Sequence, residues 1–150
     1  MELTTDMLKA LRERTGVSVM QCKKALEEAS GDIDAAVALL RERAIASAEK
    51  KADRELGAGT IGSYTHDGVM GAMVLLSCET DFVAKNPEFL TLARELAMQV
   101  AAMDPADPEA LLAEPSIKDG SRTVRDLVNE AVQKFGERVE IASFSRLSVR

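Results

Sequence analysis

Residues 61–78 have the sequence Ile61-Gly62-Ser63-Tyr64-Thr65-His66-Asp67-Gly68-Val69-Met70-Gly71-Ala72-Met73-Val74-Leu75-Leu76-Ser77-Cys78, which predicts a β-hairpin. Two stretches of β-forming residues, 61–65 and 69–78, flank the segment His66-Asp67-Gly68, which is typical of a tight hairpin turn. The second stretch is apolar on both faces in its middle. We therefore expect it to be a central strand that helices cover.

The helices that would cover the hairpin follow it in the chain. One is expected to begin at Asn86-Pro87, where a capping residue precedes a proline at the first helical position. Another is expected to begin after the capping residue Thr123 and to end at Gly136. Between them, residues 104–116 contain three of the four prolines and predict a loop. A final strand is expected to have one apolar face, made of Val139, Ile141, Leu147 and Val149.

Three short helices are expected in the first forty residues. Their N-terminal capping residues are Thr4 or Thr5, Ser18 and Asp32. The second of these helices is expected to bury Met20. Residues beyond the third are rich in alanine and charged side chains and predict an exposed helical linker. The expected fold is therefore α+β, with a three-helix module over residues 1–41, a helical linker over 42–57, and a core over 58–150 in which helices pack on a small antiparallel sheet.

Charge and composition exclude several kinds of partner. The 150 residues carry 19 basic and 25 acidic side chains, a net charge of −6. The chain lacks the clustered basic residues that bind a phosphate backbone, so no direct nucleic-acid partner is expected. The start, Met1-Glu2-Leu3-Thr4-Thr5-Asp6, is acidic where a signal peptide is basic, and the longest apolar stretch, residues 69–76, is far shorter than a membrane span. We expect a cytoplasmic protein without a membrane partner.

Few residues could carry out catalysis. The chain has one histidine, His66, and two cysteines, Cys22 and Cys78. A single histidine argues against an ordinary zinc site, and no phosphate-binding glycine motif or nucleophile motif occurs. Buried cysteines commonly act as small hydrophobic residues. We expect no enzyme, no catalytic residue, no metal and no cofactor, and a cysteine hydrolase built on Cys78 is the least favoured alternative.

An unusual segment follows the hairpin: Cys78-Glu79-Thr80-Asp81-Phe82-Val83-Ala84-Lys85. Aromatic residues make up only 3% of the chain, so a phenylalanine on a loop is conspicuous. In one interpretation, Phe82 and Val83 pack beneath the following helix. In the other, Phe82 is an aromatic wedge for a pocket on a partner, and Asp81 fixes its orientation. The residues alone do not decide between the two.

Two segments resemble the bacterial elongation factor Ts family. The first runs from Leu11-Arg12-Glu13-Arg14-Thr15-Gly16 through residues 20–26 to Ser30-Gly31-Asp32, and it is similar to the family signature on a ubiquitin-associated-like three-helix module. The second, residues 78–84, is similar to the core signature around the family's Thr-Asp-Phe-Val motif. Both signatures occur in the family's order and spacing, and the resemblance extends to Phe144-Ser145-Arg146-Leu147. It is a resemblance to the short form, which has a single core subdomain.

The resemblance implies a function in translation. Members of the family are guanine-nucleotide exchange factors that bind elongation factor Tu, with GDP or without nucleotide, and promote GDP release by displacing Mg²⁺. The positions that match the loop at the Mg²⁺ side of the nucleotide site are Thr80, Asp81, Phe82 and Val83. The positions that match the N-terminal contact with the partner are Arg12, Val19 and Met20.

The resemblance also bears on self-association. Residues 103–123 are shorter than the corresponding stretch of the family, and no second core subdomain follows. A chain of this form is expected to pair with a second copy through its sheet, without a covalent bond because the last strand has no cysteine. The chain departs from the family pattern at Ser18 and Val19, in place of glycine and methionine, and before the core motif at Leu75 and Ser77.

A different class of function remains open when the N-terminal module is considered alone. Such a module could belong to an adaptor that binds a ubiquitin-like protein or a nascent chain, with the α+β part serving as a dimerisation domain. An adaptor would bind its partner without changing that partner's nucleotide kinetics.

Overall fold

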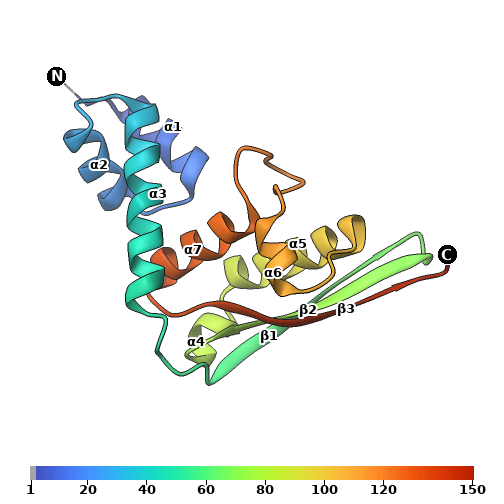
Figure 1. The fold of residues 1–150 in the computed structure, drawn as a ribbon. Coiled ribbons are helices and arrows are strands. Elements are labelled where there is room, and N and C mark those ends of the chain that lie inside the picture. Colours follow the sequence, from blue (N-terminus) through green and yellow to red (C-terminus); the bar gives the residue numbers. More distant parts are fainter. Residues whose placement is uncertain (1–2) are drawn as a thin grey trace.

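The fold was analysed in a computed structural model that describes residues 3–150; Met1 and Glu2, which belong to the predicted module and to the acidic start, lie outside the described residues. The chain is α+β, as expected (Figure 1). Its elements are α1 (Thr5–Thr15), α2 (Val19–Glu28), α3 (Ile33–Lys50), β1 (Ala58–His66), β2 (Met70–Cys78), α4 (Asp81–Ala84), α5 (Pro87–Met103), α6 (Pro108–Ala113), α7 (Val124–Phe135) and β3 (Glu140–Ser148).

The first three helices pack around a core of their own. The side chains of Thr4, Ser18 and Asp32 accept hydrogen bonds from backbone N–H groups in the first turns of α1, α2 and α3, as the sequence predicts. The buried residues of this core are Leu11, Val17, Cys22, Ala25, Leu26, Ala36 and Leu40. The expectation that Met20 is buried is wrong, because its side chain is 82% exposed. Met20 lies about 200° around the helix from the buried Cys22, so the two face opposite ways.

Helix α3 joins this bundle to the rest of the chain without a break (Figure 1). The expected module boundary at residue 41 falls inside α3. The extension is helical to Lys50 and mostly exposed, as predicted, but Ala44 is buried and α3 packs against α7, so one side of the helix is covered. The contact was missed because alanine makes a weak hydrophobic stripe, although its small side chain lets two helices approach closely. Residues 51–57 then run to β1 without further helix.

The predicted hairpin is confirmed. β1 pairs with β2 and β2 pairs with β3, both antiparallel, so β2 is the central strand of a three-stranded sheet. The backbone N–H of Val69 donates to the carbonyl of His66 across the turn. Asp67 and Gly68, between them, have φ angles of 53° and 69°. Positive φ at both central residues is what a type I′ hairpin turn requires.

Helices cover only one face of the sheet (Figure 1). Along β2, the even-numbered residues point toward α5 and are buried: Ala72, Val74, Leu76 and Cys78. Met73 and Leu75 point the other way and are exposed. The expectation that helices cover both faces of β2 is therefore wrong, and the second apolar face is open to solvent.

The capping signals in the second half of the chain are confirmed. Asn86 caps α5, with Pro87 at its first position. Thr123 and Asp126 form a capping box at the start of α7, which ends at Gly136 in the left-handed conformation. Two short helices were not expected. Thr80 caps α4 where the sequence predicts a loop, and Asp107 caps α6, which begins at Pro108 within the other predicted loop.

The last strand carries an irregularity that the sequence did not indicate. Leu75 pairs with Ser143 and Leu76 pairs with Ile141, so Ala142 is an extra residue at this point. One extra residue reverses the alternation of side chains along a strand. Ile141 is consequently buried, whereas Leu147 lies on the open face, and the expectation of one shared apolar face is wrong. Among residues 3–150, no helix is long and apolar enough to cross a membrane.

Candidate functional site

Phe82 stands on a short turn of helix at the end of β2. Its side chain is 85% exposed, whereas Val83 and Ala84 beside it are buried in the core. The segment is here called the Phe82 turn, residues 79–84. Its buried residues hold it to the core while the ring of Phe82 points to solvent. The interpretation in which Phe82 packs beneath the following helix is therefore wrong, although it holds for Val83.

A carboxylate that is distant in the sequence but adjacent in the fold holds the Phe82 turn. Glu137 follows α7, and its Oε1 accepts hydrogen bonds from the backbone N–H groups of Glu79 and Thr80, both at 3.0 Å. Its Oε2 accepts the hydroxyl proton of Thr80 at 2.6 Å. The same hydroxyl oxygen of Thr80 caps α4 by accepting from the N–H of Val83 at 3.4 Å. Three donors on two consecutive residues thus converge on one carboxylate.

In a second set of contacts, a side chain of the Phe82 turn accepts a hydrogen bond from the segment that follows α7. The carboxylate of Glu79 accepts a hydrogen bond from the backbone N–H of Arg138 at 2.5 Å, and it lies 3.6 Å from the guanidinium of Arg54. The guanidinium of Arg138 donates to the carbonyl of Arg54 at 2.7 Å. The Phe82 turn, the start of β3 and the segment before β1 are therefore tied together at one end of the sheet.

Asp81 does not take part in these contacts. Its side chain is exposed, and it makes no side-chain hydrogen bond to any residue that the structure describes. The interpretation of Phe82 as a wedge assigns the fixing of its orientation to Asp81. Within this chain the carboxylate that holds the turn is that of Glu137.

Cys78, the last residue of β2, is buried and makes a hydrogen bond to the Phe82 turn. Burial raises the pKa of its thiol, and the negative charge of Glu137 raises it further, so the group remains a thiol near neutral pH. The thiol donates to the carbonyl of Thr80 at 3.3 Å. Cys78 pairs with Ala58, and His66 lies at the opposite end of the same hairpin, so the two cannot form a nucleophile–base pair. Within residues 3–150, no group of acidic, histidine or cysteine side chains is arranged to hold a metal ion.

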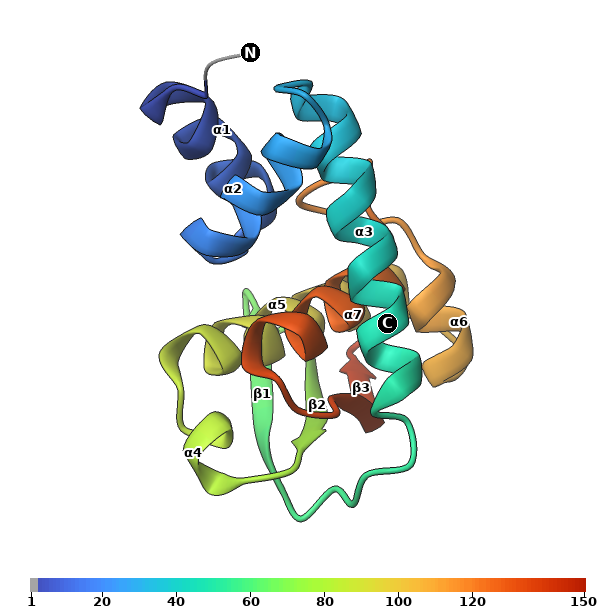
Figure 2. The same cartoon turned by 90° about the vertical axis from the view of Figure 1, so that its left-hand side faces the viewer.

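The other predicted contact positions lie on the N-terminal bundle. Arg12, Val19 and Met20 are all exposed, and Met20 is among the most exposed large apolar side chains of the chain. Figures 1 and 2 place α2 and α4 at the same end of the molecule, away from the tip of the hairpin. Met20 belongs to α2 and Phe82 to α4, so two separate parts of the fold each present an exposed apolar side chain.

Comparison with known proteins identifies the family. The family model described as Elongation factor TS matches residues 79–150, which begin with the Phe82 turn. The chain is 37% identical to an elongation factor Ts from Leptospira biflexa, in an alignment that covers 99% of this chain and 98% of the relative. The chain belongs to the elongation factor Ts family. This membership places it among translation elongation factors.

Other members of the family are similarly related. The elongation factor Ts of Thermodesulfovibrio yellowstonii is 36% identical over 99% of this chain and 97% of the relative. That of Solidesulfovibrio magneticus is 40% identical over 98% of this chain and 96% of the relative. The alignment with the Leptospira protein runs over 195 positions, which is 45 more than the 150 residues of this chain. The aligned part of the Leptospira protein therefore contains positions that have no counterpart in this chain.

Proposed function

We propose that this protein is a guanine-nucleotide exchange factor that binds elongation factor Tu with GDP and promotes GDP release. The observation that carries the proposal is an exposed phenylalanine on an anchored turn, in a chain of the elongation factor Ts family. Covering an exposed ring of this size removes apolar area from water, which favours binding to a partner. Because the turn that carries the ring is held rigidly, less conformational entropy is lost when the ring enters a partner's pocket.

The proposed complex uses two contacts. Arg12, Val19 and Met20 of the N-terminal bundle dock on the partner, and the Phe82 turn enters it at the Mg²⁺ side of the nucleotide site. Phe82 pushes between partner side chains, Asp81 faces the partner, and Thr80 and Val83 shape the turn. Both elements lie on the side of the molecule that faces the viewer in Figure 2, α2 above and α4 below, and a partner that covers this side could engage both contacts.

Nucleotide release then follows from displacement of the groups that hold GDP. A bound nucleoside diphosphate depends on phosphate contacts and on Mg²⁺, and a small displacement of either weakens those interactions. Each loss of about 1.4 kcal/mol in binding free energy weakens GDP tenfold. Coupling is reciprocal, so GDP weakens the binding of the factor by the same ratio and rebinding of nucleotide expels it. The protein is thus proposed to act by differential binding, not as an enzyme, and in the cytoplasm, where translation takes place.

The first test is the release of a fluorescent GDP analogue from elongation factor Tu in a stopped-flow instrument. We expect release to accelerate with the concentration of this protein and to reach a plateau. No acceleration by a folded sample would refute the proposal.

A pull-down separates an exchange factor from an adaptor. Elongation factor Tu is captured on this protein once in EDTA and once in excess GDP with Mg²⁺. An exchange factor is expected to hold its partner in EDTA and to lose it in GDP, because the two ligands oppose each other. Equal capture in both conditions would favour the adaptor.

Phe82→Ala is expected to fold normally and to lose most of the exchange activity. Because the ring is exposed, its removal should change the free energy of unfolding by less than about 0.5 kcal/mol. The maximal rate of GDP release should fall at least tenfold if the ring acts as a wedge. The matched control is Ile117→Ala, which removes another exposed apolar side chain away from the turn. Normal exchange by a folded Phe82→Ala protein would remove the wedge from the mechanism.

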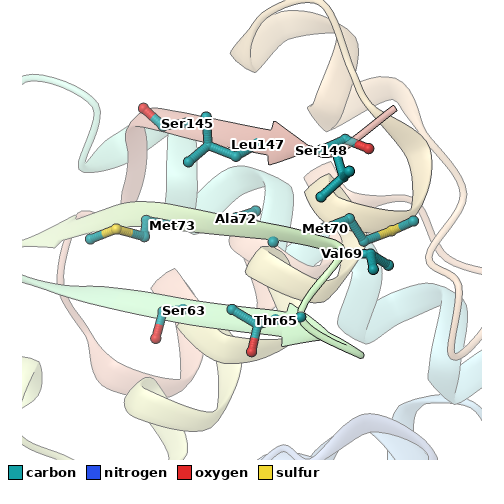
Figure 3. Close-up of a pocket in the computed structure, with 12 residues that line it drawn as sticks. Ser63, Thr65, Val69, Met70, Ala72, Met73, Ser145, Leu147 and Ser148 are labelled. Carbon is teal, nitrogen blue, oxygen red and sulfur yellow. The ribbon is translucent and has the colours of Figure 1, made fainter.

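We also propose that the open face of the sheet pairs with the same face of a second copy. This face carries large exposed apolar side chains, among them Ile61, Met73, Leu147 and Val149. Met73, Leu147 and Val149 line a shallow apolar hollow of about 480 Å³ on this face, toward the tip of the hairpin (Figure 3). An apolar face of a sheet normally packs against another layer of structure. A second copy of the chain can supply that layer, because two-fold symmetry brings identical surfaces together.

Light scattering after size-exclusion chromatography tests this dimer. The wild-type protein is expected to have the mass of two chains at micromolar concentration. Leu147→Lys should reduce it to one chain, because a charge at the centre of an apolar interface is costly to bury. The control is Leu90→Lys, on the opposite side of the sheet, where Leu90 is also exposed. A wild-type mass of one chain would rule out the dimer.

A further inference from the structure

We infer that Glu137 is the positioning residue for the Phe82 turn, and that its carboxylate sets the direction in which Phe82 is presented. The inference rests on the proposed exchange function and adds to it a residue outside the predicted Thr80–Val83 motif. Glu137 is separated from Thr80 by 57 residues, and it reaches the turn because α7 and the start of β3 lie beside the end of β2.

The ring of Phe82 has few contacts within the protein that could fix its orientation. Its side chain is 85% exposed, so its direction depends on the backbone of α4. Helix α4 has only four residues, Asp81–Ala84, which is too short to be stable by itself. Its geometry must therefore come from its cap, Thr80, and from the packing of Val83 and Ala84 against the core.

The hydroxyl group of Thr80 connects Glu137 to α4. A hydroxyl has one proton to donate and lone pairs to accept with. Its proton goes to Oε2 of Glu137, which leaves the oxygen free to accept the N–H of Val83. A carboxylate can only accept, so it imposes this arrangement on the hydroxyl. The two backbone N–H groups that point to Oε1 fix the start of the turn as well.

Glu137 is itself held on both sides. Gly136 before it has a φ of 69° and ends α7, which turns the chain toward the sheet. Arg138 after it gives its N–H to Glu79 and its guanidinium to the carbonyl of Arg54. Val139 is buried in the core. The carboxylate is thus mounted on a rigid segment, which is the property expected of a group that positions another residue.

A residue that positions the wedge has a distinctive kinetic effect. The hydrogen bonds of Glu137 go to Glu79 and Thr80 and not to the N-terminal bundle, so docking on the partner should be retained when the turn is loosened. The maximal rate of GDP release should fall, because fewer bound complexes present Phe82 correctly. The concentration of factor at half-maximal rate should change little. General unfolding would instead lower the amount of active factor and raise that concentration.

Two substitutions of Glu137 form a graded test. In Glu137→Gln the amide oxygen can still accept the two backbone N–H groups, but the amide nitrogen cannot accept the proton of Thr80. We expect a roughly tenfold lower maximal rate, the size that follows from losing one charge-assisted hydrogen bond. Glu137→Ala loses all three bonds and should be slower still. The matched control is Glu42→Gln, which removes the same charge from an exposed position on α3 and should exchange as the wild type does, because Glu42 lies outside the contacts that hold the turn.

Hydrogen exchange of the free protein provides a readout that does not depend on the partner. The amides of Glu79 and Thr80 should exchange faster in Glu137→Ala, while amides in the centre of α5 and α7 should stay protected. An unchanged maximal rate in Glu137→Ala, or unchanged protection of those two amides, would overturn the inference. If the wild type does not accelerate GDP release, the proposed function fails. Faster amide exchange would then still support Glu137 as the residue that positions the turn, and unchanged exchange would overturn that too.

Discussion

At the scale of single residues, the close contact between the sheet and α5 depends on Gly62. A Cβ atom at this position would lie 2.3 Å from the backbone carbonyl carbon and oxygen of Ala93. Backbone atoms cannot move aside as the end of a flexible side chain can. The absence of a side chain at Gly62 therefore lets α5 lie directly on β1, and α5 in turn carries the largest share of the core that supports the Phe82 turn.

Gly62→Ala is expected to destabilise the protein by about 2 kcal/mol, the usual cost of overpacking a tight contact. The measurement is the free energy of unfolding in urea. Gly120→Ala is the matched control, because a Cβ at Gly120 meets no atom within 4 Å. Equal stability of the two variants would show that α5 can shift away from the sheet at little cost.

Residue-scale reasoning from sequence identified the motif at Phe82 but not the residue that holds it. Capping residues such as Thr80 act on groups three positions away, so their partners can be inferred from spacing. Glu137 acts across 57 residues. The sequence near Glu137 shows only that it follows Gly136, a glycine that ends a helix. This position does not predict the direction of the Glu137 carboxylate.

At the scale of elements, the bulge at Ala142 decides which residues of β3 face the core. Before it, Ile141 points inward; after it, Phe144 packs against the core, and Arg146 donates to the carbonyl of Ala101 in α5 at 3.0 Å. Sequence patterns assume strict alternation, and one unpaired residue reverses the alternation from that point on. The same bulge adds Leu147 to the apolar surface of the open face.

Deletion of Ala142 is expected to be tolerated much better than deletion of Ser145. Removing the extra residue leaves Ile141 and Phe144 on the inner face of a regular strand. Removing Ser145 would force either Phe144 or Arg146 to the wrong face. Thermal unfolding followed by circular dichroism compares the two, and we expect the Ser145 deletion to have a Tm lower by about 2–4 °C or more, the shift that each 1 kcal/mol produces in a chain of this length. A lower Tm for the Ala142 deletion would mean that the bulge itself is required.

At the scale of the whole molecule, α3 and α7 connect the N-terminal bundle to the core, and charged groups line their junction. Arg41 of α3 donates to the carbonyl of Ser121 at 3.4 Å and lies 4.0 Å from the carboxylate of Asp126. Glu130 of α7 forms an ion pair with Arg122 at 2.7 Å. These contacts set the distance between the two proposed partner contacts, on α2 and α4.

Glu130 predicts a pH dependence of stability. Burial raises the pKa of Glu130 above its ordinary value of 4.5, with Asp126 raising it further and Arg122 and Arg41 opposing the shift. Between 4.5 and the raised pKa, the folded state binds more protons than the unfolded state. The contribution of Glu130 to the free energy of unfolding therefore falls as pH rises through this interval.

Glu130→Gln should remove that contribution. Urea unfolding at a series of pH values from 4 to 7 gives the free energy of unfolding of the wild type and of the variant, and the difference between the two measures the contribution of Glu130. As pH rises through the interval, the free energy of unfolding of the wild type should fall relative to that of the variant. Glu42→Gln, at an exposed carboxylate of α3, serves as the control and should show no such trend. A constant difference for Glu130→Gln would mean that its protonation is not linked to folding.

The sequence by itself determined the helix caps, the hairpin turn, the α+β order of elements and the family to which the chain belongs. These features rest on residues close together in the chain, where spacing and side-chain chemistry act directly. Only the tertiary structure decided that Met20 and Phe82 face solvent, that one face of the sheet is open, and that Glu137 holds the turn. Each of these depends on how distant segments pack, because burial and long-range hydrogen bonds are set by the position of the whole chain and not by any short pattern within it.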